Sequence, residues 1–206
     1  MAQQRLKTIP VFQLLNNYFF DASPFGIFGH RKIDLIFKIW ESVLLNRSIL
    51  IFADSPDLSS EAVIVAVSLI FPLRYVGEFH PYFTIFDQKF NSLKNQKLND
   101  KNVIIGVTNP LFRKSMDCVS LSIHLDQEFE KTLQEKHGDD ISLKKYLVSK
   151  HKPLIKSSLK VSNLMTLGNS AEAIKINNEI IKKRLLELTL SFLEPFYLYF
   201  LKQSNV

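Results

Sequence analysis

Two short apolar runs place the strongest constraint on the fold of this chain. Residues 49–53 (ILIFA) and 102–107 (NVIIGV) hold almost no polar side chains and show no alternation between apolar and polar positions. Such runs are typical of strands that are buried on both faces, as in a parallel sheet. Each is followed by a turn that contains proline and then by a helical stretch, and this alternation favours an α/β fold. We predict a mostly parallel sheet that is sandwiched by helices and followed by a C-terminal helical segment.

An amphipathic helix is predicted to begin at Ile33, ahead of the first strand. Its apolar residues recur at intervals of three and four positions: Ile33, Ile36, Phe37, Trp40, Val43 and Leu44. Lys38, Glu41 and Ser42 lie between these positions, so they are expected to face solvent.

A second helix is predicted over residues 61–71. It is apolar nearly all round and is therefore expected to be buried. Ser59 or Ser60 is the expected N-cap, because a serine hydroxyl can accept a hydrogen bond from a free N–H group at a helix start. Residues 73–76 (LRYV) are predicted to form the second strand of the sheet.

Shorter elements are predicted to follow. A short helix is expected after Asp87, which would cap it, and residues 108–110 (TNP) turn directly into another short helix. Residues 118–125 alternate between apolar and polar side chains, which indicates a strand with one solvated face at a sheet edge. No strand is expected after residue 126.

A long helix is predicted from Glu172 to Glu194, and Pro195 is expected to break it. One face of this helix carries the apolar residues Ile174, Ile181, Leu185, Leu188 and Phe192. The expected organisation has four parts: an N-terminal lead-in over 1–32, an α/β domain over 33–130, a lysine-rich connector over 131–171 and a helical segment over 172–206.

Composition indicates a globular protein of the cytoplasm. Of the 206 residues, 46% are hydrophobic and 22% are charged. No apolar run reaches the roughly 18 residues of a membrane span. The N-terminus is polar, which argues against a secretion signal, and the single Cys118 fits a reducing compartment. The 17 phenylalanines indicate a core rich in large rings and an apolar surface that a partner covers.

The net charge of +6 is concentrated in one region. Residues 131–184 hold 12 Lys and Arg against 5 acidic residues. Six lysines stand in a stretch without acids: Lys144, Lys145, Lys150, Lys152, Lys156 and Lys160. A solvated connector is the favoured interpretation, and a surface for anionic lipid or an acidic partner is the alternative. Nucleic acid is not an expected partner, because the acid-free stretch that holds these six lysines, residues 141–171, has no arginine and no recognisable nucleic-acid motif.

The sequence offers no apparatus for covalent chemistry. The five histidines are scattered without metal-ligand spacing, so no metal is expected. No glycine-rich phosphate loop and no GxSxG elbow occur, so no cofactor and no catalytic residue are expected. Asp54 follows a strand as the nucleophile of some phosphotransfer enzymes does. A turn role is favoured, because Pro56 stands where such a site needs a second acid.

Several short motifs, in their order along the chain, resemble one family. They are WESVL at 40–44, ADSP at 53–56, PLRY at 72–75, PYFTI at 81–85, IGVTNPLF at 105–112 and LELT at 186–189. The stretches 81–85 and 106–110 are the most specific. Together the motifs resemble the central DENN region and the start of the downstream DENN helices, in the branch of the stabilization-of-polarity-axis proteins, over residues 33–200.

The resemblance implies a Rab GTPase as partner. Proteins of this family promote release of GDP by holding the nucleotide-free Rab between the central region and an upstream longin-like lobe. Such a factor needs no nucleophile, because it acts by differential binding. Only about 32 residues precede the first predicted helix here, and a longin-like lobe needs on the order of 100. We expect either a fragment or a reduced protein, with the longin-like lobe on another segment or chain.

The residues expected to meet the Rab follow the predicted strands, because partners of open α/β sheets bind beyond the carboxyl ends of strands. These residues are Asp54, Ser55 and Pro56 after the first strand, Glu78, Phe79, His80, Pro81 and Tyr82 after the second, and Thr108 and Asn109 after the third. The resemblance places the protein in vesicle and endosome trafficking, in the cytoplasm and peripherally on endosomal membranes. The alternatives are a scaffold without exchange activity that uses the lysine-rich segment, and a small hydrolase or phosphotransferase built on Asp54.

Overall fold

The computed structural model describes residues 21–29, 33–95, 102–115, 119–125, 147–149 and 171–204. Their centre is a sheet of five strands in the order β2-β3-β1-β4-β5. The strands are β1 (Ile49–Phe52), β2 (Glu78–His80), β3 (Val103–Val107), β4 (Leu121–His124) and β5 (Leu147–Ser149). The first four are parallel, and β5 is antiparallel to β4. The predicted α/β class with a mostly parallel sheet is confirmed.

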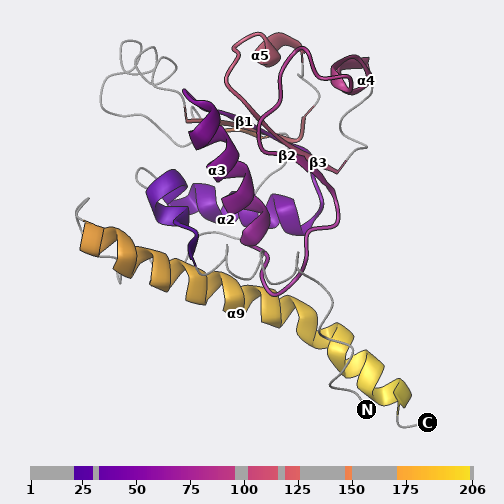
Figure 1. Ribbon diagram of the computed structural model, residues 1–206. Helices are drawn as coiled ribbons and strands as arrows, with labels where there is room; N and C mark the ends of the chain where they lie inside the picture. The colour runs from indigo at the N-terminus through magenta and orange to yellow at the C-terminus, as the bar shows by residue number, and fades with distance from the viewer. Residues whose placement is uncertain are drawn as a thin grey trace, which may run out of the picture.

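Helices cover both faces of this sheet. They are the π-helical turn η1 (Phe25–Gly29), α2 (Ile33–Leu44), α3 (Pro56–Ser68), α4 (Phe90–Asn95), α5 (Phe112–Ser115) and α9 (Ala171–Ser204). In Figure 1, α2 and α3 lie on the side of the sheet that faces α9, and α4 and α5 lie on the other side. Among the described residues, no helix combines the length and the hydropathy that crossing a bilayer requires.

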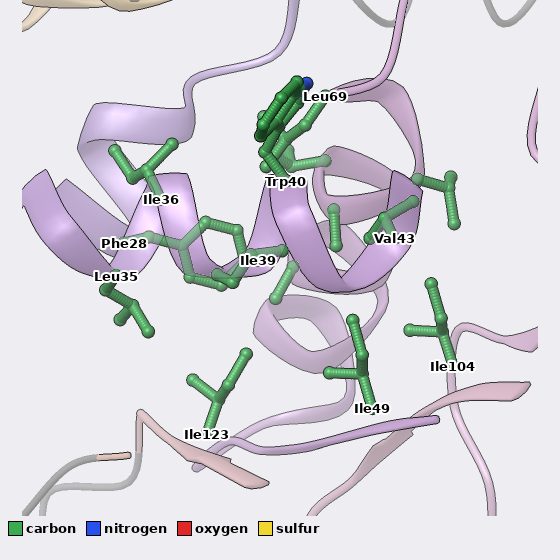
Figure 2. Packing of buried hydrophobic residues seen from close by; sticks show 14 of the residues in the cluster. Phe28, Leu35, Ile36, Ile39, Trp40, Val43, Ile49, Leu69, Ile104 and Ile123 are labelled. Atoms are coloured by element: carbon green, nitrogen blue, oxygen red, sulfur yellow. The ribbon is translucent and has the colours of Figure 1, made fainter. Parts of the chain in front are cut away.

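The core divides along the two faces of the sheet. Ile49 and Ile51 of β1 belong to the cluster under α2 and α3, whereas Leu50 and Phe52 belong to the cluster under α4 and α5. Figure 2 shows the labelled side chains of α2 above those of Ile49, Ile104 and Ile123. Alternate residues of β1 and β3 therefore enter two apolar layers. This explains why the two runs show no polar alternation.

Helix α2 begins at the predicted residue, but its polar residues do not face solvent as expected. Lys38, Glu41 and Ser42 are all less than 5% exposed. The Glu41 Oε1 atom lies 3.3 Å from Lys38 Nζ and 3.3 Å from Arg47 Nη1. The helix is therefore buried round more of its circumference than one apolar stripe implies. It also contacts α9, where Trp40 Nε1 donates to Thr189 Oγ1 at 3.0 Å.

Helix α3 begins earlier than predicted. Ser55 is its N-cap, since its hydroxyl accepts a hydrogen bond from Leu58 N at 3.2 Å, and Pro56 stands in the first turn. Ser59 and Ser60, the predicted caps, lie inside the helix, and Ser59 Oγ donates instead to the Pro81 carbonyl at 3.1 Å. The pair Ser55-Pro56 is the stronger signal for a helix start, because the serine accepts from a free N–H group and the proline fixes the backbone of the first turn.

The second strand also differs from the prediction. Residues 73–76 are not a strand, because the turns that close α3 extend into them: Leu73 N donates to the Ile70 carbonyl at 2.9 Å. The strand β2 follows at Glu78–His80 and pairs with β3. Beyond it, α4 begins at Phe90. Asp87 does not cap α4 with its side chain, which accepts from Thr84 instead.

Strand β4 is interior and not at an edge, because it pairs with β1 on one side and β5 on the other. Its predicted solvated face is mostly buried: Ser120, just before the strand, and His124 are less than 8% exposed, and Ser122 is half-buried. The expectation of no strand after residue 126 is wrong. Strand β5 consists of three residues within the lysine-rich segment, too short for a periodic signal to reveal it.

Helix α9 has 34 residues and continues through Pro195, so the predicted break is wrong. A proline inside a helix removes one hydrogen bond, here to the carbonyl of Ser191, and the rest of the ladder remains. The first half of α9 is fixed to the α/β layer: Asn178 Oδ1 accepts from Phe25 N at 2.8 Å, and Nδ2 donates to Ser23 Oγ at 2.9 Å. The second half exposes several large apolar side chains: Leu190, Phe192, Phe196, Tyr197, Leu198, Tyr199 and Phe200.

Tyr75 provides a test of the core. Its ring is 7% exposed and packs against Phe79, and its hydroxyl has no hydrogen-bond partner among the described residues. Tyr75→Phe is expected to raise the free energy of unfolding by about 1 kcal/mol at pH 7, because it removes an unsatisfied buried group. Urea denaturation measures this change. Tyr197→Phe, at an exposed position on α9, is expected to have no effect.

Burial of Tyr75 also makes the stability of the fold depend on pH. Burial raises the pKa of Tyr75 to about 12. Between pH 10 and 12 the unfolded chain therefore loses this proton while the folded chain keeps it, so stability falls as pH rises through that window. Tyr75→Phe is expected to fall less steeply than the unaltered protein when denaturation is repeated at pH 11. A variant that is less stable at pH 7 and equally sensitive to alkali would contradict both expectations.

Candidate functional site

The loops after β1 and β3 lie side by side at one end of the sheet. Ala53 N donates to the Val107 carbonyl at 3.0 Å, which carries the pairing of the two strands one step beyond their ends. Asp54 and Pro56 are exposed here, and Thr108 is half-buried. Residues that are far apart in the sequence thus share one surface, as the parallel arrangement requires. We call this surface the carboxyl edge, defined by residues 54–56, 81–87 and 108–111.

The loop after β2 joins the same surface. Phe83 N donates to the Gly106 carbonyl at 2.8 Å, and the hydroxyls of Tyr82 and Thr108 are 3.4 Å apart. Gly106 permits this approach. A Cβ atom there would lie 2.3 Å from Ser59 Oγ and 2.4 Å from the Pro81 carbonyl oxygen. Because Gly106 has no side chain, the loop after β2 can pack directly against β3.

The structure places the five site residues predicted after the second strand, residues 78–82, in two different positions. Pro81 and Tyr82 lie on the carboxyl edge together with Asp54, Ser55, Pro56, Thr108 and Asn109. Glu78, Phe79 and His80 do not follow the strand, since they are the strand. Phe79 packs against the core cluster under α2 and α3, with its ring centroid 6.3 Å from that of Tyr75.

Glu78 and His80 form a polar group on β2. His80 Nε2 lies 2.8 Å from Glu78 Oε1, and Lys89 Nζ donates to the same oxygen. The hydrogen bond from Lys89 holds the pKa of Glu78 below its usual value; His80 acts in the same direction and burial opposes both. The His80 ring also packs against Phe83 at a centroid distance of 5.1 Å. These contacts give the pair a structural role in fixing the start of the 81–87 loop.

The carboxyl edge carries apolar side chains that the sequence analysis missed. Phe86 is 89% exposed, Leu111 is 59% exposed and Ile85 is 37% exposed. Tyr82, which was predicted, is 41% exposed. The run PYFTIF gave an incomplete signal, because its Phe83 is buried in the core under α4 and α5 whereas its Phe86 is exposed. The surface is thus mixed, with exposed rings beside the polar loop ends.

The arrangement fits a protein-binding surface better than a reaction centre. Within the described residues, no three His, Cys, Asp or Glu side chains gather as metal ligands would. Asp54 is exposed and directly precedes the N-cap Ser55, in keeping with the favoured turn role. The six lysines proposed for an anionic surface, Lys144, Lys145, Lys150, Lys152, Lys156 and Lys160, lie outside the described residues.

Comparison with known proteins gives one consistent family. A family model described as stabilization of polarity axis matches residues 26–130, just over half of the chain. The matched range includes β1 to β4 and all the loops of the carboxyl edge.

Three relatives from distant organisms are similar over most of this chain. Protein DENND6A of Gallus gallus is 33% identical in an alignment of 177 positions that covers 78% of this chain and 29% of that protein. Protein DENND6B of Homo sapiens is 32% identical in an alignment of 173 positions that covers 76% of this chain and 28% of that protein. The DENND6 homolog of Dictyostelium discoideum is 28% identical in an alignment of 209 positions, gaps included, that covers 80% of this chain and 28% of that protein. The chain spans less than a third of the length of each.

Proposed function

Because this chain belongs to the stabilization-of-polarity-axis family of DENN-domain proteins, we propose that it binds a Rab GTPase through the carboxyl edge and contributes to GDP/GTP exchange. The observation that carries the proposal is the meeting of three loops on one surface, where Tyr82 and Thr108 are in contact and Phe86 is exposed. Partners of open α/β sheets bind at such loop ends.

Exchange by this surface would make and break no covalent bond. A protein that binds the nucleotide-free form of a GTPase more tightly than the nucleotide-bound form lowers the affinity for nucleotide by the same factor. The required property is a preformed surface, and hydrogen bonds from two of the loops to β3 support it: 3.0 Å from Ala53 N to the Val107 carbonyl and 2.8 Å from Phe83 N to the Gly106 carbonyl.

The proposed setting is vesicle and endosome trafficking, in the cytoplasm with peripheral contact with endosomal membranes. A longin-like lobe, on another segment or another chain, would hold the opposite side of the Rab. The chain by itself would supply the central DENN surface, so its exchange activity is expected to be weaker than that of an assembly with the lobe.

Release of fluorescent GDP from a panel of Rabs tests the proposal. We expect at least one Rab to bind the immobilised chain in its nucleotide-free form and to dissociate when GDP or GTP is added in excess. Addition of a relative's longin-like lobe should accelerate GDP release from the same Rab. Failure to bind every nucleotide-free Rab, with and without that lobe, would exclude the function.

A matched pair of variants locates the surface. Thr108→Arg places a long charged side chain on the carboxyl edge, and Val76→Arg places it on the loop before β2, where Val76 is 85% exposed. Only the first is expected to weaken binding of the Rab, by about tenfold or more, because charge and bulk inside an interface oppose close packing. Equal binding by the two variants would exclude the carboxyl edge as the site.

A further inference from the structure

The turn formed by residues 84–87 exposes the aromatic ring of Phe86 to solvent. Phe86 is 89% exposed, the highest value among the exposed apolar side chains of the described residues. Single exposed apolar residues are common on protein surfaces, so exposure alone does not indicate a function. At Phe86, however, hydrogen bonds fix the backbone of the turn that carries the ring.

Hydrogen bonds within the turn fix its shape. The Asp87 carboxylate accepts from Thr84 N at 2.7 Å and from Thr84 Oγ1 at 3.0 Å. The Thr84 hydroxyl oxygen in turn accepts from Phe86 N at 3.3 Å. The backbone of Phe86 is thereby held by its own neighbours, so binding of the ring costs less backbone entropy than it would in a loop without these bonds.

Aromatic rings on both sides of this turn pack against Phe112 of α5, which is fully buried. Phe83, before the turn, is 2% exposed, and its ring centroid lies 6.0 Å from that of Phe112. Phe90, after the turn, contacts Phe112 edge to face at 5.5 Å. Phe86 therefore projects from a base that is part of the core under α4 and α5, as an interface anchor must.

The charges of the carboxyl edge indicate the chemistry of the surface that receives this ring. Asp54 and Asp87 of the carboxyl edge are exposed, and so are Asp57 and Glu61 in the adjoining first turns of α3. Lys89, two residues after Asp87, is exposed too, and it donates to Glu78. A pocket that complements this edge would be apolar at its centre and bordered by basic side chains.

We propose that Phe86 is the apolar anchor of the carboxyl edge and enters a pocket of this kind on the small GTPase, a role that rests on the proposed function. A ring of this size in the centre of an interface removes a large apolar area from water and typically accounts for much of the affinity. The acidic border orients the partner and speeds encounter, with a smaller effect on affinity.

Binding of the nucleotide-free Rab by full-length variants of this chain tests the anchor. Phe86→Ala is expected to weaken binding at least tenfold, and Phe86→Leu to weaken it less, because leucine keeps part of the apolar area. Val76→Ala and Phe200→Ala, which shorten exposed apolar side chains elsewhere, should bind as the unaltered chain does. Circular dichroism should show all four folded, since the replaced side chains are exposed.

Salt dependence separates the ring from the charges around it. Affinity is expected to fall as salt rises in both the unaltered chain and Phe86→Ala, with equal slopes, because the acidic residues are unchanged. If the unaltered chain binds a Rab and Phe86→Ala binds it equally well, the anchor is excluded and the proposed function stands. If the unaltered chain binds no Rab, the proposed function fails and the anchor fails with it.

Discussion

Replacing Gly106 with alanine is expected to lower the free energy of unfolding by about 3 kcal/mol and to abolish binding of the Rab. The added Cβ would lie 2.3 Å from Ser59 Oγ, 2.4 Å from the Pro81 carbonyl oxygen and 2.9 Å from Val63 Cγ2. Overpacking of this kind typically costs 1–3 kcal/mol, and more where backbone must move. Urea denaturation measures the change in the free energy of unfolding. The Rab-binding assay measures the loss of affinity that is expected when the 81–87 loop is displaced.

Two further variants show whether the cost at Gly106 comes from the close approach. Ser59→Ala removes the hydrogen bond to Pro81 without adding atoms, and should cost only about 1 kcal/mol. Gly106→Ala combined with Ser59→Ala should recover a minor part of the loss, because the Pro81 carbonyl oxygen remains in the way. The free energy of unfolding of Gly106→Ala could instead lie within about 0.5 kcal/mol of that of the unaltered protein, roughly the error of such measurements. That result would contradict the close packing of α3 and the 81–87 loop on β3.

Replacing Glu41 with leucine is expected to cost about 3 kcal/mol. Glu41 is 3% exposed and accepts from Lys38, which is 4% exposed. Removal of one partner leaves a buried charge without its counterion, which typically costs 3–5 kcal/mol. Arg47, whose side chain is 22% exposed, can reach water and should contribute less to the loss.

The double variant Lys38→Met with Glu41→Leu is the control for this buried pair. It removes both charges and should restore most of the stability, because a buried ion pair exchanged for apolar residues is often neutral. Glu61→Leu, at an exposed position of α3, should change the free energy of unfolding by less than about 0.5 kcal/mol. A double variant as unstable as Glu41→Leu alone would show that the helix packing, and not the charge, sets the cost.

The sequence was informative wherever burial is reflected in the local pattern. β1 and β3 are buried on both faces, so their apolar runs identified them and the parallel sheet directly. The loops after these two strands could be named for the same reason. The start of α2 also followed from periodicity, because one face of that helix packs on the sheet as the pattern implies.

The failures have in common that the local periodicity does not reveal the contacts that decide the structure. Lys38 and Glu41 have the spacing of solvent-facing residues, and only the packed helices around them make them buried. Strand β5 has three residues, and its pairing with β4 decides its structure. Phe86 stands in a motif that was recognised, but its exposure is set by the fold of the turn, which no periodicity describes.

Hydrogen–deuterium exchange of the chain with and without nucleotide-free Rab tests the central claim most directly. Amides of residues 82–87, 108, 109 and 111, together with those of 54 and 55, are expected to gain protection, because a partner that covers the carboxyl edge excludes water from these loops. Residues 73–77, before β2, and the exposed end of α9 should exchange as in the free chain. Protection confined to those regions, with none on the three loops, would contradict the account.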